Sequence, residues 1–144
     1  VAKDQFSRMF DLAIDFREEP PDLGIEAARR IAAICEQMGA KAKISSIHVN
    51  TWFGEYSKVD MIAYYLSTVC GIDPARQREA VVYCGDSPND APMFGRFPLS
   101  CGVANIKPLR HLLEHQPAFV SEAAYAEGFV EIAGTLMRAR ENIK

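Results

Sequence analysis

The stretch at residues 81–90, VVYCGDSPND, constrains the fold of this chain more than any other. Four apolar or aromatic residues run into Gly85, and the positions that follow hold two carboxylates and an amide. An unbroken apolar run bounded by turn residues predicts a strand buried on both faces, as in a parallel sheet. We expect Gly85 to let the backbone turn where that strand ends. Asp86 and Asp90 would then lie at the carboxyl end of the strand, where open α/β sheets bind their ligands.

The two carboxylates of this loop would repel each other unless a cation or a cationic side chain lay between them. Oxygen ligands at the end of a strand favour Mg²⁺. The sequence therefore predicts that Asp86 and Asp90 bind Mg²⁺. The alternative is an ordinary solvated turn, because Asp, Asn, Ser, Pro and Gly are the usual turn residues.

Composition narrows the function classes. At 144 residues the chain has room for one domain, or for one domain and part of another. The net charge of −3, without a run of Lys or Arg, argues against a nucleic-acid partner. No apolar stretch approaches the length of a membrane span, so no membrane partner is expected. The four cysteines form no CxxC pair, which favours buried free thiols and a cytoplasmic location.

Hydrophobic periodicity alternates between strand-like and helix-like along the chain. In the first part, residues 10–16 and 42–49 predict strands, residues 23–38 predict a helix that Gly39 ends, and residues 48–54 predict a turn or hairpin. In the second part, residues 81–84, 99–103 and 118–120 predict strands, and residues 58–70, 91–94 and 125–140 predict helices. The first and the last of these helices should each turn one apolar face inward: Met61, Ile62, Tyr65, Leu66 and Val69 in the first, and Phe129, Ile132, Ala133, Leu136 and Met137 in the last. The alternation of strands and helices indicates an α/β fold with a parallel sheet. We place a boundary after residue 54, which gives units at 1–54 and 55–144.

The acidic loop also carries a resemblance to a known family. Residues 85–90 match the GDxxND loop of the haloacid-dehalogenase superfamily of phosphatases. Lys58, at the start of the helix that precedes the strand of the acidic loop, matches the lysine of that superfamily. Residues 102–105 (GVAN) look like the end of the next strand in that superfamily. The order resembles the branch with an inserted α/β cap, which includes sucrose-phosphate and mannosyl-phosphoglycerate phosphatases. The resemblance implies a Rossmann-like core over residues 55–144, with residues 1–54 as part of the cap.

The resemblance also implies roles for the residues of the loop. Asp86 would bind Mg²⁺ directly, and Asp90 would hold a metal-bound water or pair with Lys58. Asn89 would orient the loop or the phosphate, and Lys58 would face the phosphoryl oxygens. The alternative for Lys58 is an ordinary surface lysine. A cation at a helix N-terminus is unfavourable next to the helix dipole, so an acidic or phosphate neighbour explains Lys58 better.

Substrate contacts are expected from the cap and from the strand after the acidic loop. His48, Asn50 and Trp52 lie where the cap of similar enzymes meets the substrate, expected to be a sugar phosphate. Trp52 could stack on a sugar ring or pack within the cap, and His48 could point to solvent. Asn105 could line the phosphate pocket or cap the helix that starts at Ile106, and the sequence favours the cap.

One departure from the family concerns the nucleophile. The superfamily attacks phosphate with an aspartate in a DxDx(T/V) motif, and no aspartate of this sequence has a second aspartate two positions on. We therefore expect the chain to be the C-terminal part of a longer phosphatase and to be inactive alone. A non-catalytic module that binds a phosphorylated ligand or a partner subunit is the alternative. Without the neighbouring nucleophile strand, residues 81–84 would present an open edge that favours self-association.

A weaker pattern is the HxxEH sequence from His111 to His115, which is found in one class of zinc proteases. Two histidines four residues apart share one face of a helix and could bind zinc with a third ligand. Gln116 and Pro117 follow at once, however, and end any helix there. The sequence favours exposed histidines at this position over a zinc site.

Overall fold

The chain divides into two compact units between Tyr56 and Ser57 in the computed structural model, which describes residues 1–142. Unit 1 is Val1–Tyr56, and unit 2 begins at Ser57. Unit 1 contains an antiparallel sheet, and unit 2 contains a parallel one. The predicted α/β class is confirmed at this level. No helix within residues 1–142 combines the length and the apolar character that crossing a membrane requires.

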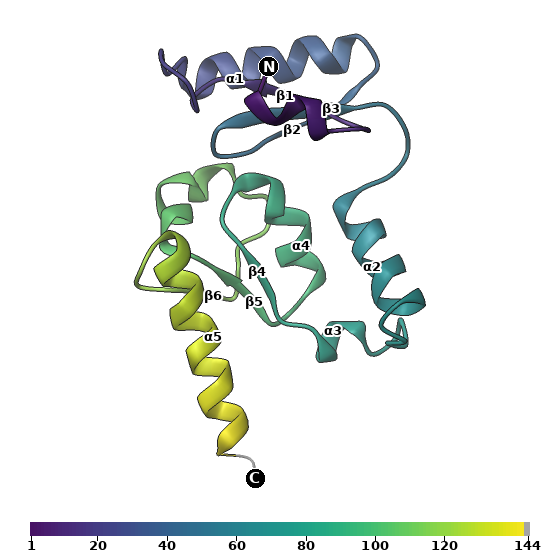
Figure 1. Cartoon of the computed structure of the whole chain (residues 1–144), viewed down its shortest axis with the longest axis vertical. Helices are drawn as coiled ribbons and strands as arrows, with labels where there is room; N and C mark the ends of the chain where they lie inside the picture. The colour runs from purple at the N-terminus through teal and green to yellow at the C-terminus, as the bar shows by residue number, and fades with distance from the viewer. Residues whose placement is uncertain (143–144) are drawn as a thin grey trace. The chain divides into compact units, whose positions relative to one another are not determined.

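Unit 1 is a three-stranded sheet covered by one helix (Figure 1). Its elements are η1 (Lys3–Ser7), β1 (Leu12–Asp15), α1 (Gly24–Gln37), β2 (Lys41–Ile44) and β3 (His48–Trp52), with sheet order β1-β3-β2. Ala28 of α1 packs against Phe16, Ala42 and Val49, and these four residues form a buried core. Gly39 ends α1 as predicted, with a φ of 85° that favours glycine.

The prediction of one strand over residues 42–49 is wrong, because the chain reverses at Ser45 and forms the β2–β3 hairpin. The Ser45 hydroxyl oxygen accepts a hydrogen bond from the His48 N–H at 3.0 Å, and the Ser45 N–H donates to the His48 carbonyl at 2.8 Å. Serine competes for backbone groups in this way and so stabilises turns. Residues 48–52, predicted as a turn or hairpin, therefore form the central strand of the sheet.

Unit 2 is a three-stranded parallel sheet with helices on its two faces (Figure 1). The strands, in the order β4-β5-β6, are β4 (Tyr83–Gly85), β5 (Ser100–Gly102) and β6 (Phe119–Val120). The helices are α2 (Lys58–Thr68), α3 (Gln77–Ala80), η2 (Pro88–Asp90), α4 (Ala91–Arg96), η3 (Ala104–Leu112) and α5 (Tyr125–Glu141). All three strands and the three main helices were predicted near these positions.

The alternation of side chains along β4 assigns each face of this sheet to a helix. Tyr83 packs against Phe94 of α4, with ring centroids 5.9 Å apart. Cys84, the next residue, packs on the opposite side with Cys101 and with Ile132 of α5. This alternation places the phenol of Tyr83 on the α4 side of the sheet and leaves the thiol of Cys84 on the α5 side.

Burial of residues 81–84 on both faces was predicted, and this is wrong, because Val82 is exposed and Tyr83 and Cys84 are only half-buried. Strand β4 is also at the edge of its sheet. Strand β5 pairs with it on one side, and no other strand within residues 1–142 pairs with it. The strand therefore presents backbone groups that another strand could cover, next to the exposed side chain of Val82.

We expect the open edge of β4 to pair chains in solution. Val82→Lys, which places a charge at the residue that precedes β4, should shift the protein towards the monomer, because a charge beside an open strand edge opposes edge-to-edge pairing. Light scattering over a concentration series measures this shift. Val69→Lys, at an exposed site on α2, is the matched control and should leave the assembly state as it is. A native chain that stays monomeric throughout the series would contradict the prediction.

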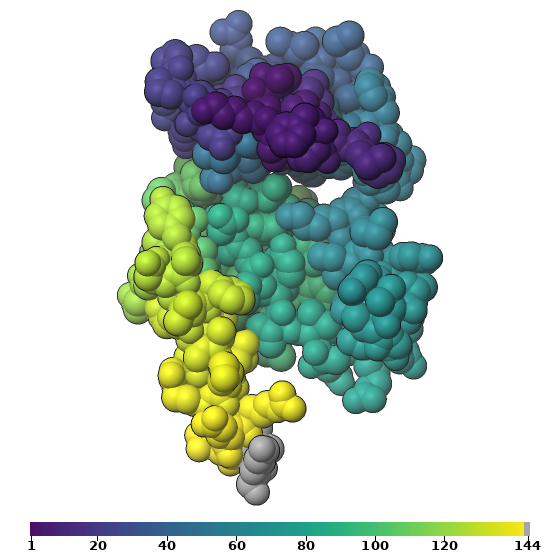
Figure 2. All heavy atoms as spheres, in the orientation of Figure 1, coloured from purple at the N-terminus to yellow at the C-terminus, as the bar shows by residue number. Residues whose placement is uncertain are grey.

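The predicted apolar faces of α2 and α5 are buried only in part. On α5, Ile132 enters the core, whereas Phe129, Leu136 and Met137 are exposed. Figure 2 shows α5, in yellow-green to yellow, at the surface of unit 2. On α2, the predicted inward residues Met61, Tyr65 and Val69 are exposed. Helix α2 packs mainly on α4 rather than on the sheet, which leaves much of its surface to solvent.

The four cysteines are all free thiols, as predicted. Cys101 is buried, Cys35 and Cys84 are half-buried, and Cys70 is exposed, so burial was wrongly predicted for Cys70. Cys70 follows the last turn of α2, where its side chain has left the helix face that packs on the protein. Burial raises the pKa of the Cys84 and Cys101 thiols, which keeps them protonated.

Candidate functional site

Asp90 is the centre of the polar network at the end of β4. Its Oδ1 accepts hydrogen bonds from Lys58 Nζ at 2.6 Å and from the Tyr83 hydroxyl at 2.6 Å. Its Oδ2 accepts from the backbone N–H of Asp86 at 2.9 Å and of Ser87 at 3.2 Å. Asp90 is only 4% exposed, and every neighbour is a donor. The carboxylate therefore has the partners that a buried charge requires.

The pairing of Asp90 with Lys58 is one of the two roles that we expected for Asp90. Lys58 is the first residue of α2, where the Ser57 hydroxyl oxygen accepts a hydrogen bond from the Asp60 N–H at 3.1 Å. This cap fixes the start of the helix and hence the origin of the lysine side chain. The Lys58 side chain is 45% exposed, so its ammonium pairs with Asp90 and also meets solvent.

Tyr83 belongs to this network and was not predicted as a site residue. Its ring stacks on Phe97 at 6.2 Å, and its hydroxyl donates to Asp90. A tyrosine within an apolar strand that leads into an acidic loop is a signal that could have identified it, since a buried phenol needs an acceptor. Tyr83 thus ties the Asp90 carboxylate to the face of the sheet that α4 covers.

The environment shifts the pKa of both groups. Burial alone would raise the pKa of Asp90, but the hydrogen bonds from Lys58 and Tyr83 and the charge of Lys58 lower it below its usual value. Burial, and then the hydrogen bond to Asp90, raise the pKa of Tyr83 far above its usual value. The carboxylate is therefore charged and the phenol neutral at physiological pH, and both states suit the hydrogen bond between them.

Gly85 has a different role from the one expected. Its φ is not among the positive values of the chain, so the turn after β4 does not depend on a left-handed glycine. Instead, a Cβ atom at Gly85 would lie 2.8 Å from Cβ, Cγ and Oδ2 of Asp90. Glycine is needed here because the Asp90 side chain folds back over the strand end.

Asp86 contributes the exposed carboxylate of the site. Its backbone N–H is held by Asp90, but its side chain is exposed and accepts no hydrogen bond from the described residues. The adjacent Ser87 hydroxyl donates to Asn89 Oδ1 at 2.5 Å, so Asn89 contributes to the shape of the loop. Of the two predicted metal ligands, Asp86 has free oxygens, whereas both oxygens of Asp90 accept hydrogen bonds already.

Asn105 does not cap the helix that follows it, so this prediction is wrong; the N-cap of η3 is Val103. Asn105 Nδ2 donates to the Asp86 carbonyl at 3.4 Å, and its Oδ1 accepts from the Tyr125 N–H at 3.0 Å. It thereby links the acidic loop to the first residue of α5. Tyr125 has a φ of 54°, the left-handed region, which costs a residue with a side chain about 1–3 kcal/mol.

A cleft of about 470 Å³ opens at this end of the sheet, and we call it the strand-end cleft. It is lined by Gly85, Asp86 and Asp90 from the acidic loop and the strand before it, and by Tyr125, Ala126 and Phe129 from the first turns of α5. Its position at the carboxyl ends of parallel strands is the usual ligand position in open α/β sheets. The cleft therefore combines a free carboxylate with exposed aromatic rings.

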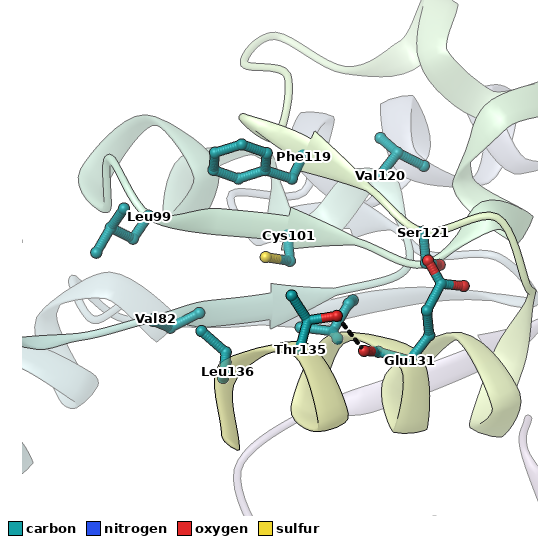
Figure 3. Close-up of a pocket in the computed structure, with 10 residues that line it drawn as sticks. Val82, Leu99, Cys101, Phe119, Val120, Ser121, Glu131, Thr135 and Leu136 are labelled. Carbon is teal, nitrogen blue, oxygen red and sulfur yellow. Dashed lines mark hydrogen bonds between the residues drawn. The ribbon is translucent and has the colours of Figure 1, made fainter. Parts of the chain in front are cut away.

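A second hollow of about 320 Å³ lies between the sheet of unit 2 and the later turns of α5 (Figure 3). Its wall is mostly apolar, with Val82, Leu99, Phe119 and Leu136 among the lining residues. The carboxylate of Glu131 is the charged group there, and it already accepts hydrogen bonds from the backbone N–H of Glu122 and Ala123. This hollow offers no free polar group for chemistry, unlike the strand-end cleft.

The three site residues predicted in unit 1 lie together on β3. His48 is 7% exposed, and its Nε2 is 2.8 Å from Glu18 Oε2, so the alternative that it points to solvent is wrong. Trp52 Nε1 donates to the Tyr56 carbonyl at 3.2 Å, in keeping with a packed aromatic side chain. Asn50 Oδ1 accepts a long hydrogen bond from Arg8 at 3.5 Å.

Within residues 1–142, no three side chains of His, Cys, Asp or Glu are grouped closely enough to hold an ion. The pair His111 and His115 does not share a helix face, because η3 ends at Leu112. The His115 ring instead packs against Gly95, where an added Cβ would lie 2.7 Å from the ring.

The chain has a structural relative among solved proteins. The crystal structure of Thermoplasma acidophilum 0175 (APC014) resembles it with a TM-score of 0.58 and 19% sequence identity. The match covers 92% of this chain and 52% of that chain, so the chain described here spans about half the length of that protein. No family model matches the sequence, and no curated protein matches it. At this level of identity the similarity shows a shared fold.

Proposed function

We propose that the chain is the C-terminal part of a magnesium-dependent phosphate-monoester phosphatase similar to the haloacid-dehalogenase superfamily. In this proposal, unit 2 is half of a Rossmann-like core, and unit 1 is part of an α/β cap. The observation that carries the proposal is the 2.6 Å contact between Lys58 Nζ and Asp90 Oδ1, which joins residues 32 positions apart at the end of β4. A surface lysine and a solvated turn would not require this contact.

Lys58 is suited to contact a phosphoryl group. One N–H of its ammonium donates to Asp90, and the half-exposed side chain leaves the other N–H groups for an anion. Asp90, fixed by Tyr83 and two backbone donors, would hold the ammonium in one position. Phosphoryl transfer depends mostly on such positioning and on electrostatic stabilisation of the phosphoryl oxygens.

The residues fit Mg²⁺ in one respect. Asp86 offers a free carboxylate at the strand end, and Mg²⁺ is commonly held by one or two carboxylates together with waters and substrate phosphate. Bound there, the ion would neutralise negative charge on the phosphoryl oxygens. Asp86 is the residue that would hold it, and Asn89 with Ser87 would keep the loop in shape. A sugar phosphate remains the proposed substrate class, by resemblance to the capped branch of the family.

Binding of inorganic phosphate in the presence of Mg²⁺, measured by calorimetry, tests the proposal. We expect Lys58→Met to weaken binding by about 10- to 100-fold, because it removes a charge-assisted hydrogen bond. Asp86→Asn should remove the dependence on Mg²⁺. Lys107→Met and Glu79→Gln are matched controls at exposed positions and should bind like the native chain. Equal binding by Lys58→Met and the native chain would overturn the proposal.

The pure 144-residue chain should not hydrolyse phosphate monoesters, because its sequence contains no DxDx(T/V) nucleophile motif. An assay with para-nitrophenyl phosphate and Mg²⁺ checks this expectation. Turnover that is lost in Asp86→Asn would show that the nucleophile lies elsewhere in this chain, and would contradict it. Rescue of turnover by a separately made segment that carries a DxDx(T/V) motif would support the phosphatase proposal.

The missing motif also favours a second candidate, a non-catalytic module that binds a phosphorylated ligand or a partner subunit. Such a module would keep the Lys58–Asp90 pair and the strand-end cleft for binding. The two candidates predict the same phosphate affinity but differ in the rescue experiment. A chain that binds phosphate and is never rescued would support the non-catalytic module.

A further inference from the structure

The side of the strand-end cleft that faces the acidic loop is aromatic. Tyr125 and Phe129 are four residues apart on α5, so their rings lie on one face of the helix. Both line the cleft, and they are 72% and 55% exposed. Two large rings left open beside a free carboxylate form a surface that a flat or apolar ligand face would cover.

The backbone around these rings is held firmly by contacts that do not involve the rings. Asn105 Oδ1 accepts a hydrogen bond from the Tyr125 N–H at 3.0 Å and so holds Tyr125 in its left-handed conformation. Gly128 lies against the preceding loop so closely that an added Cβ would be 2.7 Å from Ser121 Oγ. The Glu131 carboxylate accepts the Ala123 N–H at 3.0 Å. A rigid support of this kind preorganises a binding surface.

Asn105 sets the distance between the Asp86 carboxylate and the aromatic rings of α5. Asn105 also donates to the carbonyl of Asp86 at 3.4 Å, so the same amide connects the acidic loop to the first residue of α5. A ligand that contacts Asp86 therefore meets the aromatic rings at a fixed offset. The cleft volume of about 470 Å³ is in the range of small-molecule sites.

We propose that Tyr125 and Phe129 form the subsite for the ring of a ring-bearing phosphate monoester whose phosphoryl group lies beside Lys58 and the Mg²⁺ that Asp86 would hold. This inference rests on the proposed function, since it takes the phosphoryl group to bind beside Lys58 and that ion. Stacking on the two aromatic rings selects a ligand with a flat or apolar ring face, which an acyclic phosphate lacks. A hexose phosphate and a nucleoside monophosphate share this chemistry.

Calorimetry with the full chain and Mg²⁺ tests the subsite with four probes: glucose 6-phosphate, adenosine 5′-monophosphate, glycerol 3-phosphate and inorganic phosphate. We expect at least one ring-bearing probe to bind about five- to tenfold more tightly than glycerol 3-phosphate. Tighter binding of glucose 6-phosphate would identify the ring as a sugar, and tighter binding of adenosine 5′-monophosphate would identify it as a nucleobase. Phe129→Ala and Tyr125→Asn should each reduce that preference, and asparagine tolerates the left-handed conformation of residue 125.

Val130→Ala is the matched control, because Val130 is exposed on the same helix but does not line the cleft. It should keep the full preference for the ring. Equal affinity for all three esters would overturn the subsite, and so would a preference for the ring that survives in both aromatic variants. In either case, phosphate binding that still depends on Lys58 would leave the proposed function standing. Failure of every probe, including inorganic phosphate, would overturn the proposed function and the subsite with it.

Discussion

Truncation of Asp90 to alanine is expected to lower the free energy of unfolding of unit 2 by about 3 kcal/mol. The change leaves the Tyr83 hydroxyl and the backbone N–H groups of Asp86 and Ser87 without their acceptor. An unsatisfied buried donor costs about 1–3 kcal/mol, although solvent can reach part of this site. The Lys58 ammonium adds little to the loss, because its half-exposed side chain can be hydrated instead.

The measurement must report on unit 2 alone. The single tryptophan, Trp52, belongs to unit 1, so its fluorescence does not follow the unfolding of β4. Amide hydrogen exchange of residues in β4 and β5 does. Tyr83→Phe isolates the phenol and should cost about 1 kcal/mol, and Glu79→Gln, at an exposed carboxylate on α3, is the control. A loss from Asp90→Ala no larger than that from Glu79→Gln would contradict the buried network.

Acidification should remove the stabilisation that the Asp90 carboxylate contributes to the fold. The pKa of Asp90 is lowered in the folded chain, so the unfolded chain takes up the proton first as the pH falls. The contribution of Asp90 is therefore complete above about pH 4, the ordinary range of an aspartate, and is lost as the pH falls through the folded pKa. The difference in unfolding free energy between the native chain and Asp90→Asn should shrink below that pH. A difference that stays constant in acid would show that the charge of Asp90 does not stabilise the fold.

Replacement of Gly85 by alanine is the second change with a large expected effect. The new Cβ would lie 2.8 Å from three atoms of the Asp90 side chain, which is fixed by its own hydrogen bonds and cannot move without losing them. Overpacking of this kind costs about 1–3 kcal/mol, and displacement of Asp90 adds to the cost. We expect a loss close to that of Asp90→Ala, together with weaker phosphate binding, because Lys58 loses its fixed partner.

A second glycine provides the comparison. Gly134 lies within α5, where the nearest atom to an added Cβ is Arg138 Nη1 at 3.3 Å, the end of a flexible side chain. Gly134→Ala should therefore stabilise the helix by about 0.5–1 kcal/mol, as alanine does in a helix interior. Both variants replace glycine with alanine, but Gly85→Ala should lower the free energy of unfolding and Gly134→Ala should raise it. A double variant of Gly85→Ala with Asp90→Ala should lose less than the sum, since both act on one side chain.

The acidic loop could be predicted in part from the order of residues along the chain. The helix start at Lys58, the strand before Gly85 and the short helix after Asp90 all follow from local patterns, and their structure agrees with the prediction. Pairing of Lys58 with Asp90 was one of two expected roles. The roles of Gly85 and Asn105 were wrongly predicted, because each depends on a side chain from another element that comes close in space.

The exposure of apolar side chains could be predicted only in part from periodicity. The apolar face of α5 has the spacing of a buried helix face, yet only Ile132 of the predicted set is fully packed. Hydrophobic spacing indicates which residues share a face, and the other elements that pack on the helix decide how much of that face is covered. The same limit explains Tyr125 and Phe129, whose place beside the acidic loop depends on how α5 crosses the sheet end.

The sequence by itself determined most elements of this protein, the α/β class and the concentration of charge after β4, because these depend on neighbours within a few residues of one another. Only the tertiary structure decided which oxygen of Asp90 each donor reaches, why residue 85 must lack a side chain, and which aromatic rings border Asp86. Lys58 and the rings of α5 come from segments far apart along the chain, and the Asp90 side chain folds back over the strand end that precedes it. Packing of whole elements sets the distances between these groups, and no local pattern encodes them.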